Sequence, residues 1–523
     1  MTVEGSMSGA AASLVSHDPP APAAGSATAA TVWLTHVGAV LRSRSFRFLA
    51  ATAVAFVVLF ARAPGPWVTP LFFAEDREWT SLLVTRGFWH TALHARPDYC
   101  VFGNVLVLWT GMRLCDLFDG GDPLELARWQ AVASYLAFTV VVSLPVLLLR
   151  RRLPAAAVLA VWLLALFMPL GIHSGSWSGF SILGRATNIG FAALFVGFLL
   201  VWVRLTPAGP RPLGKILLLD LGLLASIATN PICSVFIPVA AVPLLSHLRK
   251  RGARDTRRDA PGSLASLAVI TIAALALNGI PATDRGAAAG MPGAPLDGDR
   301  VVEFALARSL LYSVSWPIYA WLDTTRTLLM AAIVGLLLWR CGLPRHRFLY
   351  AGGLALLAVT SLTMVCCRAE VGHCLDHYRT TFPDRYFYAQ YLVGLPLLAA
   401  FTADLSARLA ARPWLARLPW AGVFALAALA AWREPAWYVA DSQFIVDDDG
   451  CFARAAAAAI DRGDFRAADR RPDHRGPFVA IPVHPAFQDA EVLLPRVPVE
   501  RSVGRPGGTG AARLADRPDR PRR

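Results

Sequence analysis

The chain has 523 residues, of which 55% are hydrophobic and only 16% are charged, and its mean hydropathy is +0.47. A soluble globular protein carries about 25% charged residues, so this composition excludes a water-soluble globular protein, a disordered chain, a collagen-like repeat and a disulfide-rich secreted domain. The net charge of +14 comes from arginine clusters between apolar runs, which is typical of polytopic membrane proteins and does not indicate nucleic-acid binding.

The N-terminal residues 1–41 are predicted to be a disordered cytoplasmic tail, because residues 1–30 are rich in Ala, Ser, Gly and Pro without apolar periodicity. Eleven apolar runs follow, and each is expected to form a membrane-crossing helix. They cover residues 48–61, 128–149, 154–171, 189–203, 215–229, 231–246, 264–281, 327–339, 348–365, 386–402 and 418–432. The predicted fold class is an all-α membrane protein, a polytopic bundle of about eleven transmembrane helices within residues 42–432.

The first run is short for a span, and Ala61-Arg62-Ala63 resembles a signal-peptidase site. The sequence therefore leaves open whether this run is retained. The topology predicted for the later runs is the same in either case.

Alternate connections between the runs carry the positive charge, at residues 42–47, 150–152, 204–215, 249–258, 340–347 and 408–417. Such residues concentrate on the cytoplasmic side, so we expect a multi-pass protein of a bacterial cytoplasmic membrane with its N-terminus in the cytoplasm and its C-terminus outside. The long outside connections contain two half-apolar stretches, 101–114 and 304–321, which are expected to be helices in the membrane interface. Counting 101–114 as a span would invert every later cluster, and that alternative is rejected.

The end of the chain changes character after the last apolar run. Residues 433–502 are predicted to form a small extracytoplasmic segment, with a helix at 455–460 and a strand at 478–483. Residues 503–523 are rich in Arg, Pro and Gly and are predicted to be disordered.

The first outside connection contains two adjacent carboxylates, Glu75 and Asp76, among aromatic residues. Acidic pairs in loops are usually just solvated. A carboxylate at a partly desolvated surface can have a raised pKa and act as a general base. The pair is therefore a candidate catalytic site, with simple solvation as the alternative.

Arginines on the outside are the candidates for binding an anion. Arg385 lies at the start of a predicted helix, where the helix dipole and unpaired N–H groups favour anions, and a guanidinium can bind a phosphate through two hydrogen bonds. Contact with lipid headgroups, or pairing with the adjacent carboxylate, is the alternative role for this arginine. The other candidate substrate-binding residues lie beside it or at similar outside positions: Asp384, Tyr386, Arg185, Asn188 and Arg308.

Two groups of possible metal ligands are weak candidates. The connection 366–377 holds three cysteines and two histidines, but their spacing does not match zinc sites, so a disulfide or buried thiols are favoured and no metal is predicted. Cys100 and Cys115 bracket a predicted helix that would hold them roughly 20 Å apart, beyond disulfide reach. His90 and His94 are interpreted as interface residues.

The layout resembles that of GT-C-type glycosyltransferases, polytopic enzymes that use sugars linked to polyprenyl phosphate, and of poorly characterised bacterial membrane proteins with the same arrangement. The resemblance rests on four segments: Phe73-Ala74-Glu75-Asp76, Ala186-Thr187-Asn188, Thr229-Asn230-Pro231 and Asp384-Arg385-Tyr386-Phe387. It covers residues 48–490. The chain departs from the pattern after Asn188, where Ile189-Gly190 stands in place of His-Trp.

This resemblance implies that Asp76 is the general base, with Glu75 as its helper or as a ligand of a divalent cation, and that Arg385 holds the leaving phosphate. The implied partners are a polyprenyl-phosphate-linked sugar, an envelope glycan or lipid acceptor, and membrane lipids. A transporter or flippase is a second interpretation, but it requires ionisable residues in mid-span, and only Asp220 lies near a span end. A non-enzymatic envelope assembly protein is a third. The chain contains no P-loop or dinucleotide-binding motif.

Overall fold

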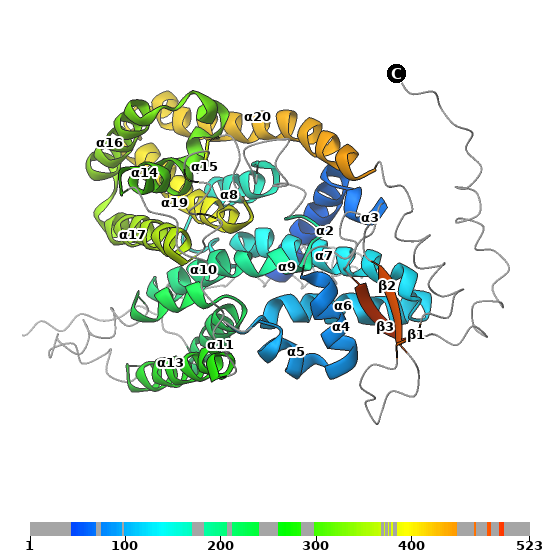
Figure 1. Ribbon diagram of the computed structural model, residues 1–523. Helices are drawn as coiled ribbons and strands as arrows, with labels where there is room; N and C mark the ends of the chain where they lie inside the picture. Colours follow the sequence, from blue (N-terminus) through cyan, green and yellow to red (C-terminus); the bar gives the residue numbers. More distant parts are fainter. Residues whose placement is uncertain are drawn as a thin grey trace, which may run out of the picture. The chain divides into compact units, whose positions relative to one another are not determined.

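The computed structural model of the protein is almost entirely helical, with a small three-stranded sheet near the end of the chain (Figure 1). It describes residues 43–68, 75–96, 99–169, 182–206, 212–239, 260–283, 298–367, 371, 375, 378–379, 384–446, 465–466, 478–482 and 491–495. Residues 1–47 and 48–523 form two units. The architecture below is that of residues 48–523.

The helices follow one another with short connections in both halves of the chain. The first half forms α2 (Arg44–Arg62), α3 (Gly65–Val68), α4 (Asp76–Arg86), α5 (Phe88–His94), α6 (Phe102–Asp119), α7 (Pro123–Leu148), α8 (Ala155–Phe167), α9 (Ala186–Ile189), η1 (Gly190–Ala192), α10 (Ala193–Leu205), α11 (Leu213–Thr229) and η2 (Pro231–Val235). The second half forms α13 (Ala260–Thr283), α14 (Gly298–Phe304), the π-helix η4 (Ala305–Leu311), α15 (Tyr312–Ser315), η5 (Trp316–Trp321), α16 (Thr324–Cys341), α17 (Pro344–Cys367), η7 (Asp384–Tyr386), α19 (Tyr388–Arg408) and α20 (Pro413–Val446).

Among the described residues, five helical stretches are long and apolar enough to cross a membrane: Arg44–Arg62, Glu125–Leu148, Ala186–Leu205, Thr324–Cys341 and Pro413–Trp432. Shorter apolar helices cover Ala155–Phe167, Ser266–Leu277 and Leu349–Val365. Helices of this length and composition are those of a membrane protein. Each predicted apolar run coincides with a helix over most of its described length. The count of eleven crossings and the orientation of the termini stay predictions.

The first apolar helix is built into the bundle. Ala55 and Leu59 of α2 are fully buried, and Arg62 at its end donates to the backbone oxygens of Leu166 and Met168 at the end of α8. The backbone oxygen of the next residue, Ala63, accepts a hydrogen bond from the Tyr135 hydroxyl of α7. These contacts join three helices at one end of the bundle.

Helices α6 and α7 form a closely packed pair. Gly120 ends α6 with φ 64°, a left-handed conformation that glycine adopts without strain, and its N–H donates to Cys115 O. A Cβ at Gly111 of α6 would lie 2.6 Å from the Cα atom of Gln130, so the glycine is what permits this approach. The helix predicted at 101–114 is present as α6, and its place in the membrane interface stays a prediction.

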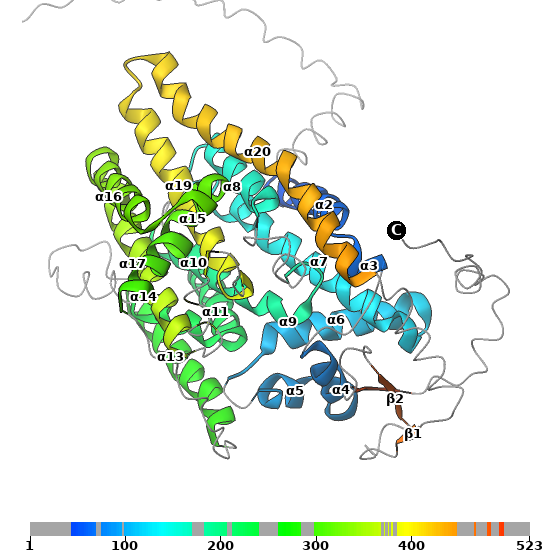
Figure 2. The same cartoon turned by 45° about the horizontal axis from the view of Figure 1, so that its top comes forward.

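Helix α19 lies at the centre of the packed helices, between α8, α10, α17 and α20 (Figure 2). Its first turns are fully buried, including the large side chains of Tyr388, Tyr391 and Leu392. This burial fixes the position of η7, which immediately precedes α19 and carries Arg385.

Two buried carboxylates, Asp220 and Asp404, connect neighbouring helices. Asp220 of α11 lies 3.3 Å from an Arg204 nitrogen of α10 and accepts a hydrogen bond from Ser266 of α13. Asp404 of α19 accepts from the Tyr350 hydroxyl at 2.7 Å and from the backbone N–H of Leu343 at 2.9 Å. Both carboxylates therefore have partners that stabilise the helix packing.

The second half-apolar stretch is less regular than the sequence predicted. Residues 304–321 form the end of α14, the π-helix η4, one α-helical turn and the 3-10 helix η5. Pro317 lies in η5, and it cannot donate a backbone hydrogen bond to continue an α-helix. The stretch is thus a broken helix rather than a single one.

The C-terminal strands β1 (Phe465–Arg466), β2 (Phe478–Pro482) and β3 (Glu491–Pro495) pair antiparallel in the order β1-β2-β3. The strand predicted at 478–483 is confirmed as β2. Strand β3 lies beside α4. The helix predicted at 455–460 and the tail 503–523 lie outside the described residues.

Candidate functional site

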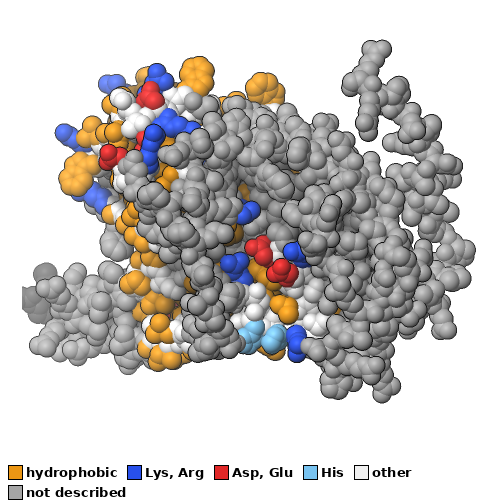
Figure 3. All heavy atoms as spheres, in the orientation of Figure 1, with side chains coloured by type: hydrophobic (Ala, Val, Ile, Leu, Met, Phe, Trp, Pro, Cys, Tyr) orange, Lys and Arg blue, Asp and Glu red, His pale blue; other side chains and the backbone are white. Residues whose placement is uncertain are grey.

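A cavity of about 480 Å³, called here the carboxylate cavity, opens where α4, α6, α9, α11 and η7 meet. Figure 3 shows acidic and basic side chains gathered on one face of the molecule, with histidine side chains close by. The cavity is lined by Glu75, Trp79, Arg96, Tyr99, Asn104, Thr187, Asn188, Gly190, Phe191, Thr229, Asn230, Arg385 and Tyr386.

Glu75, just before α4, is the acidic side chain among the described lining residues. Its Oε1 atom lies 3.5 Å from the Nη1 atom of Arg96, and the two side chains are 40% and 22% exposed. The Arg96 guanidinium lies over the Tyr99 ring, 5.0 Å from its centroid. A partly exposed ion pair of this kind is worth about 0–1 kcal/mol, so it can be exchanged for a bound ligand.

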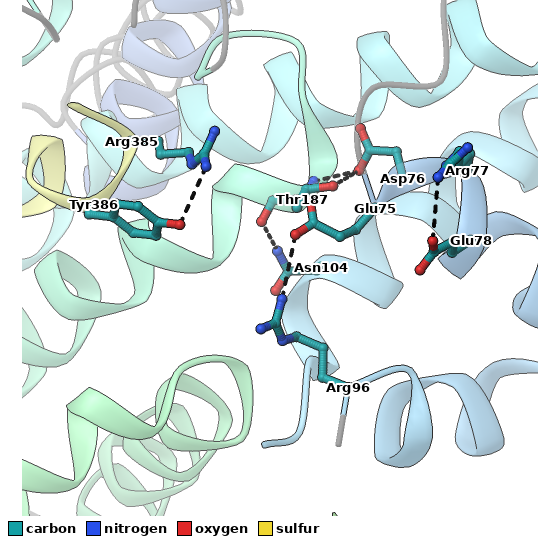
Figure 4. Close-up of polar contacts among 9 residues, drawn as sticks. All are labelled: Glu75, Asp76, Arg77, Glu78, Arg96, Asn104, Thr187, Arg385 and Tyr386. Carbon is teal, nitrogen blue, oxygen red and sulfur yellow. Dashed lines mark hydrogen bonds and ion pairs between the residues drawn. The ribbon is translucent and has the colours of Figure 1, made fainter. Parts of the chain in front are cut away.

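Asp76, the first residue of α4, lies behind the wall of the cavity. It is 5% exposed, and its carboxylate accepts hydrogen bonds from the backbone N–H of Thr187, at 2.6 Å, and from the Thr187 hydroxyl. Burial raises the pKa of Asp76 to about 6, while the Thr187 hydrogen bonds and the Arg185 charge oppose the rise. Asp76 thus holds the start of α9, and Figure 4 shows its contact with Thr187.

Arg185 is the charge partner of Asp76. It is 1% exposed, and burial lowers its pKa to about 10, against the opposing effect of the Asp76 charge. The pair places one positive and one negative charge together behind the cavity. Asp76 and Arg185 were both predicted as site residues, but neither lines the cavity.

The polar floor of the cavity, formed by Asn104, Thr229 and Asn230, depends on two glycines. The Asn104 amide nitrogen of α6 donates to the backbone oxygens of Ala186, at 3.0 Å, and Thr187, at 2.5 Å. A Cβ at Gly190 would lie 2.5 Å from the Asn104 Oδ1 atom. A Cβ at Gly103 would likewise lie 2.5 Å from the Thr229 hydroxyl, which accepts from the Gly103 N–H at 3.0 Å.

Arg385 and Tyr386 form the wall opposite α6. The Arg385 guanidinium lies 5.0 Å from the Tyr386 ring centroid and donates to its hydroxyl at 3.4 Å. The Tyr386 ring meets the Phe191 ring edge-on at 5.1 Å. The Tyr388 hydroxyl donates to the backbone oxygen of Asn188 at 2.8 Å, which ties the start of α19 to α9.

A second polar cluster holds the segment that leads to Arg385. The Glu303 carboxylate of α14 accepts hydrogen bonds from the Tyr378 hydroxyl, at 2.5 Å, from Arg379, and from the Thr324 hydroxyl at 2.7 Å. The next side chain, Phe304, meets the rings of Tyr378 and Phe387 edge-on, at 5.5 and 5.0 Å. Residues 303–304 therefore fasten both sides of the segment that contains Arg385.

Arg308, predicted as a substrate-binding residue, lies elsewhere. It is fully buried on the π-helix η4, with its guanidinium 5.3–5.5 Å from the ring centroids of Tyr312, Tyr319 and Tyr391. It does not line the carboxylate cavity.

The structure thus brings four of the predicted residues together in one cavity: Glu75, Asn188, Arg385 and Tyr386. Asp384 belongs to η7, and its side chain lies outside the description. The sequence reasoning missed Trp79, Arg96 and Asn104, because nothing in their local sequence distinguishes them from other residues of the same kinds.

The described residues contain no group of three or more His, Cys, Asp or Glu side chains that could hold a metal ion. Most of the connection 366–377 is outside the description. Cys100 and Cys115 are both free thiols, as their predicted separation requires. His90 and His94 are exposed on α5, with ring centroids 4.8 Å apart.

Comparison of the chain with protein families, with curated proteins and with solved structures finds no match. The functional argument therefore rests on the cavity and its residues.

Proposed function

We propose that the protein is an integral membrane glycosyltransferase that moves a sugar from a polyprenyl-phosphate donor to an envelope acceptor, on the outer face of the bacterial cytoplasmic membrane. The observation that supports it is the composition of the carboxylate cavity. One carboxylate and two guanidinium groups share the cavity with amide, hydroxyl and aromatic side chains. A base, a cation for a leaving phosphate and a sugar-sized polar pocket are what this transfer needs.

The polar floor suits a sugar. Asn104, Thr229 and Asn230 present amide and hydroxyl groups that both donate and accept hydrogen bonds, as sugar hydroxyl groups do. Trp79 and Tyr99 add aromatic surface to the same cavity. The five helices of the described part of the chain that are able to cross a membrane fit a donor whose carrier is a lipid.

In the proposed reaction Glu75, which faces the cavity, takes the proton from an acceptor hydroxyl. The hydroxyl oxygen then forms a bond to the anomeric carbon of the donor sugar, and the bond from that carbon to the phosphate oxygen breaks. Arg385 stabilises the polyprenyl phosphate that leaves, and the proton on Glu75 passes to solvent. Asp76 keeps Thr187 and α9 in place, rather than acting as the base that the resemblance implied.

A transporter is less well supported. Asp220, the ionisable residue on which that interpretation depends, lies in the middle of α11 and is paired with Arg204 at the end of α10 and with Ser266 of α13. These contacts are those of a residue that stabilises the packing of α10, α11 and α13.

Binding of farnesyl phosphate, a short polyprenyl phosphate, to the full chain in detergent tests the proposal. Arg385→Gln should weaken binding about 10–100-fold, since a charge-assisted hydrogen bond is worth about 1.5–3 kcal/mol. Glu75→Gln should bind normally but lose about 10²–10⁴-fold in sugar transfer. Arg113→Gln is the control, because Arg113 is an exposed arginine paired with Asp116 on α6. Binding that is insensitive to Arg385→Gln would contradict the proposal.

A further inference from the structure

We infer that the carboxylate cavity recognises the donor sugar through one hydroxyl group, which donates a hydrogen bond to Asn104 and accepts one from Asn230. This inference rests on the proposed function, and it names the feature of the sugar that the cavity selects. It depends on which hydrogen-bonding atoms of the polar floor are in use within the fold and which are left for a ligand.

Asn104 offers the cavity an acceptor. Its amide nitrogen carries two N–H groups, which donate to the backbone oxygens of Ala186, at 3.0 Å, and Thr187, at 2.5 Å. Because backbone oxygens need a donor, these two contacts fix which atom of the amide is the nitrogen. Figure 4 shows the nitrogen directed at Thr187 and the oxygen directed away from it. The side chain is 2% exposed, yet none of the described residues donates to its Oδ1 atom.

Gly190 keeps this acceptor open. A Cβ at Gly190 would lie 2.5 Å from the Asn104 Oδ1 atom, and both residues line the cavity. Any larger residue at this position would cover the oxygen. A ligand group that donates a proton here therefore completes the hydrogen bonding of Asn104.

Asn230 offers the cavity a donor. It directly precedes η2, and its Oδ1 atom accepts a hydrogen bond from the backbone N–H of Ile232 at 3.2 Å. Because a backbone N–H needs an acceptor, this contact fixes the oxygen of the amide and leaves the Nδ2 atom with its two N–H groups. The side chain is 8% exposed, and Nδ2 donates to none of the described residues. The ligand atom that satisfies Asn230 is therefore an acceptor.

The two asparagines follow one hydrogen bond that joins α6 to the end of α11. The Gly103 N–H donates to the Thr229 hydroxyl at 3.0 Å, and Asn104 and Asn230 are the next residues of the two segments. Successive Cα atoms are about 3.8 Å apart, and both amides line the same cavity, so one sugar ring can contact both. The Thr229 hydroxyl itself donates to the Ala225 backbone oxygen at 2.7 Å, which leaves it no proton for a ligand.

This arrangement distinguishes a hydroxyl from the other polar groups of the donor. A hydroxyl group has one proton to donate and lone pairs that accept, so it satisfies Asn104 and Asn230 together. An ionised phosphate diester has no proton for Asn104, and an acylated hydroxyl has none either. The donor is therefore a sugar with a free hydroxyl at this position. A sugar without it leaves two buried amide atoms unpaired, which costs binding free energy.

The experiment measures ligand binding to the full chain in detergent. The ligands are farnesyl phosphate diesters of glucose, mannose, galactose and arabinose, with methyl farnesyl phosphate as the diester that has the same charge and no sugar. At least one sugar diester should bind about tenfold or more tightly than the methyl diester. For that sugar, one monodeoxy analogue should lose most of this gain. The deoxyfluoro analogue at the same position should lose it too, because fluorine cannot donate to Asn104.

The variant Asn230→Ser assigns this loss to the polar floor. It removes the Nδ2 donor, while the serine hydroxyl can still accept from Ile232, as serine does at helix starts. Binding of the preferred sugar diester should weaken about 3–10-fold, as expected for one neutral hydrogen bond, and binding of its deoxy analogue and of the methyl diester should be unchanged. Asp323→Ser is the matched control, because Asp323 caps α16 through the Arg326 N–H at 2.7 Å and does not line the cavity.

The inference would be overturned if Asn230→Ser weakened the sugar diester and its deoxy analogue equally, because the effect would then not depend on the hydroxyl. It would also be overturned if no sugar diester bound more tightly than the methyl diester, or if every monodeoxy analogue kept the full affinity. Failure of the proposed function is distinct, because it appears as farnesyl phosphate binding that ignores Arg385→Gln.

Discussion

Replacing Asp76 by Asn should change how the stability of the protein depends on pH. Asp76 is 5% exposed, and burial raises its pKa from 3.8 to about 6. A difference of about two pH units between the folded and unfolded pKa corresponds to about 3 kcal/mol. Ionised Asp76 therefore lowers the free energy of unfolding by about 3 kcal/mol at neutral pH.

The sign follows from the direction of the shift. Because the folded protein binds this proton more tightly than the unfolded chain, the wild type should lose stability as the pH rises from about 4 to about 6, and then lose no more through this group. The Asn side chain does not ionise, and its oxygen can still accept from Thr187. Between pH 4 and pH 7, the free energy of unfolding of the Asp76→Asn variant should therefore rise by about 3 kcal/mol relative to that of wild type.

The assay is unfolding in detergent at a series of pH values, followed by tryptophan fluorescence. Glu75→Gln is the matched control, because Glu75 is the neighbouring carboxylate and is partly exposed, and this variant leaves Asp76 in place. Parallel profiles for wild type and Asp76→Asn would refute the reasoning. If Asp76→Asn is more stable but transfers less sugar, the cost of the buried charge is retained for function.

Two further perturbations test the walls of the cavity. Glu303→Gln removes the charge that holds Arg379, and through the segment that carries Arg385 it should weaken farnesyl phosphate binding about 3–10-fold. The control Glu125→Gln disturbs the surface pair with Arg128 and should leave this binding unchanged. Equal binding by both variants would show that Glu303 does not position Arg385. Gly190→Ala should destabilise the protein by about 1–3 kcal/mol, because its Cβ would press on Asn104. Gly352→Ala on α17 should be neutral or stabilising by up to about 1 kcal/mol, since nothing lies within 4 Å of the position that its Cβ would take. Thermal unfolding of the two glycine variants measures the difference between them. Equal effects on stability would contradict the prediction.

The positions of the long apolar helices could be predicted from the sequence, because a helix in a membrane needs a long apolar run and little else, whereas α4 and α5 lie in what was predicted as an outside connection. The run 348–365, for example, falls within α17. The broken helix at 304–321 was less accessible. Its π-helix depends on how Arg308 and Ser309 are buried against other helices, which no local pattern records.

The site could be predicted in part. Glu75 was identified as one of two adjacent carboxylates among aromatic residues, and Arg385 as an arginine at the start of a predicted helix. Neighbouring side chains at a helix start point about 100° apart, so one of Glu75 and Asp76 faces the cavity and the other does not. The sequence alone does not record which of the two it is. Arg308 and Arg385 looked alike as outside arginines, and only tertiary packing separates the fully buried one from the one that lines the cavity.

The tie between Tyr388 and Asn188 has a consequence for biosynthesis. The two residues are 200 positions apart in the chain, so at about 5–20 residues per second the ribosome makes Tyr388 some 10–40 s after Asn188. During that interval the Asp76–Thr187 contact can already form, but the wall with Arg385 does not yet exist. The nascent chain should therefore be unable to hold a lipid phosphate in the cavity until α19 has been inserted, late in the synthesis of the helical domain.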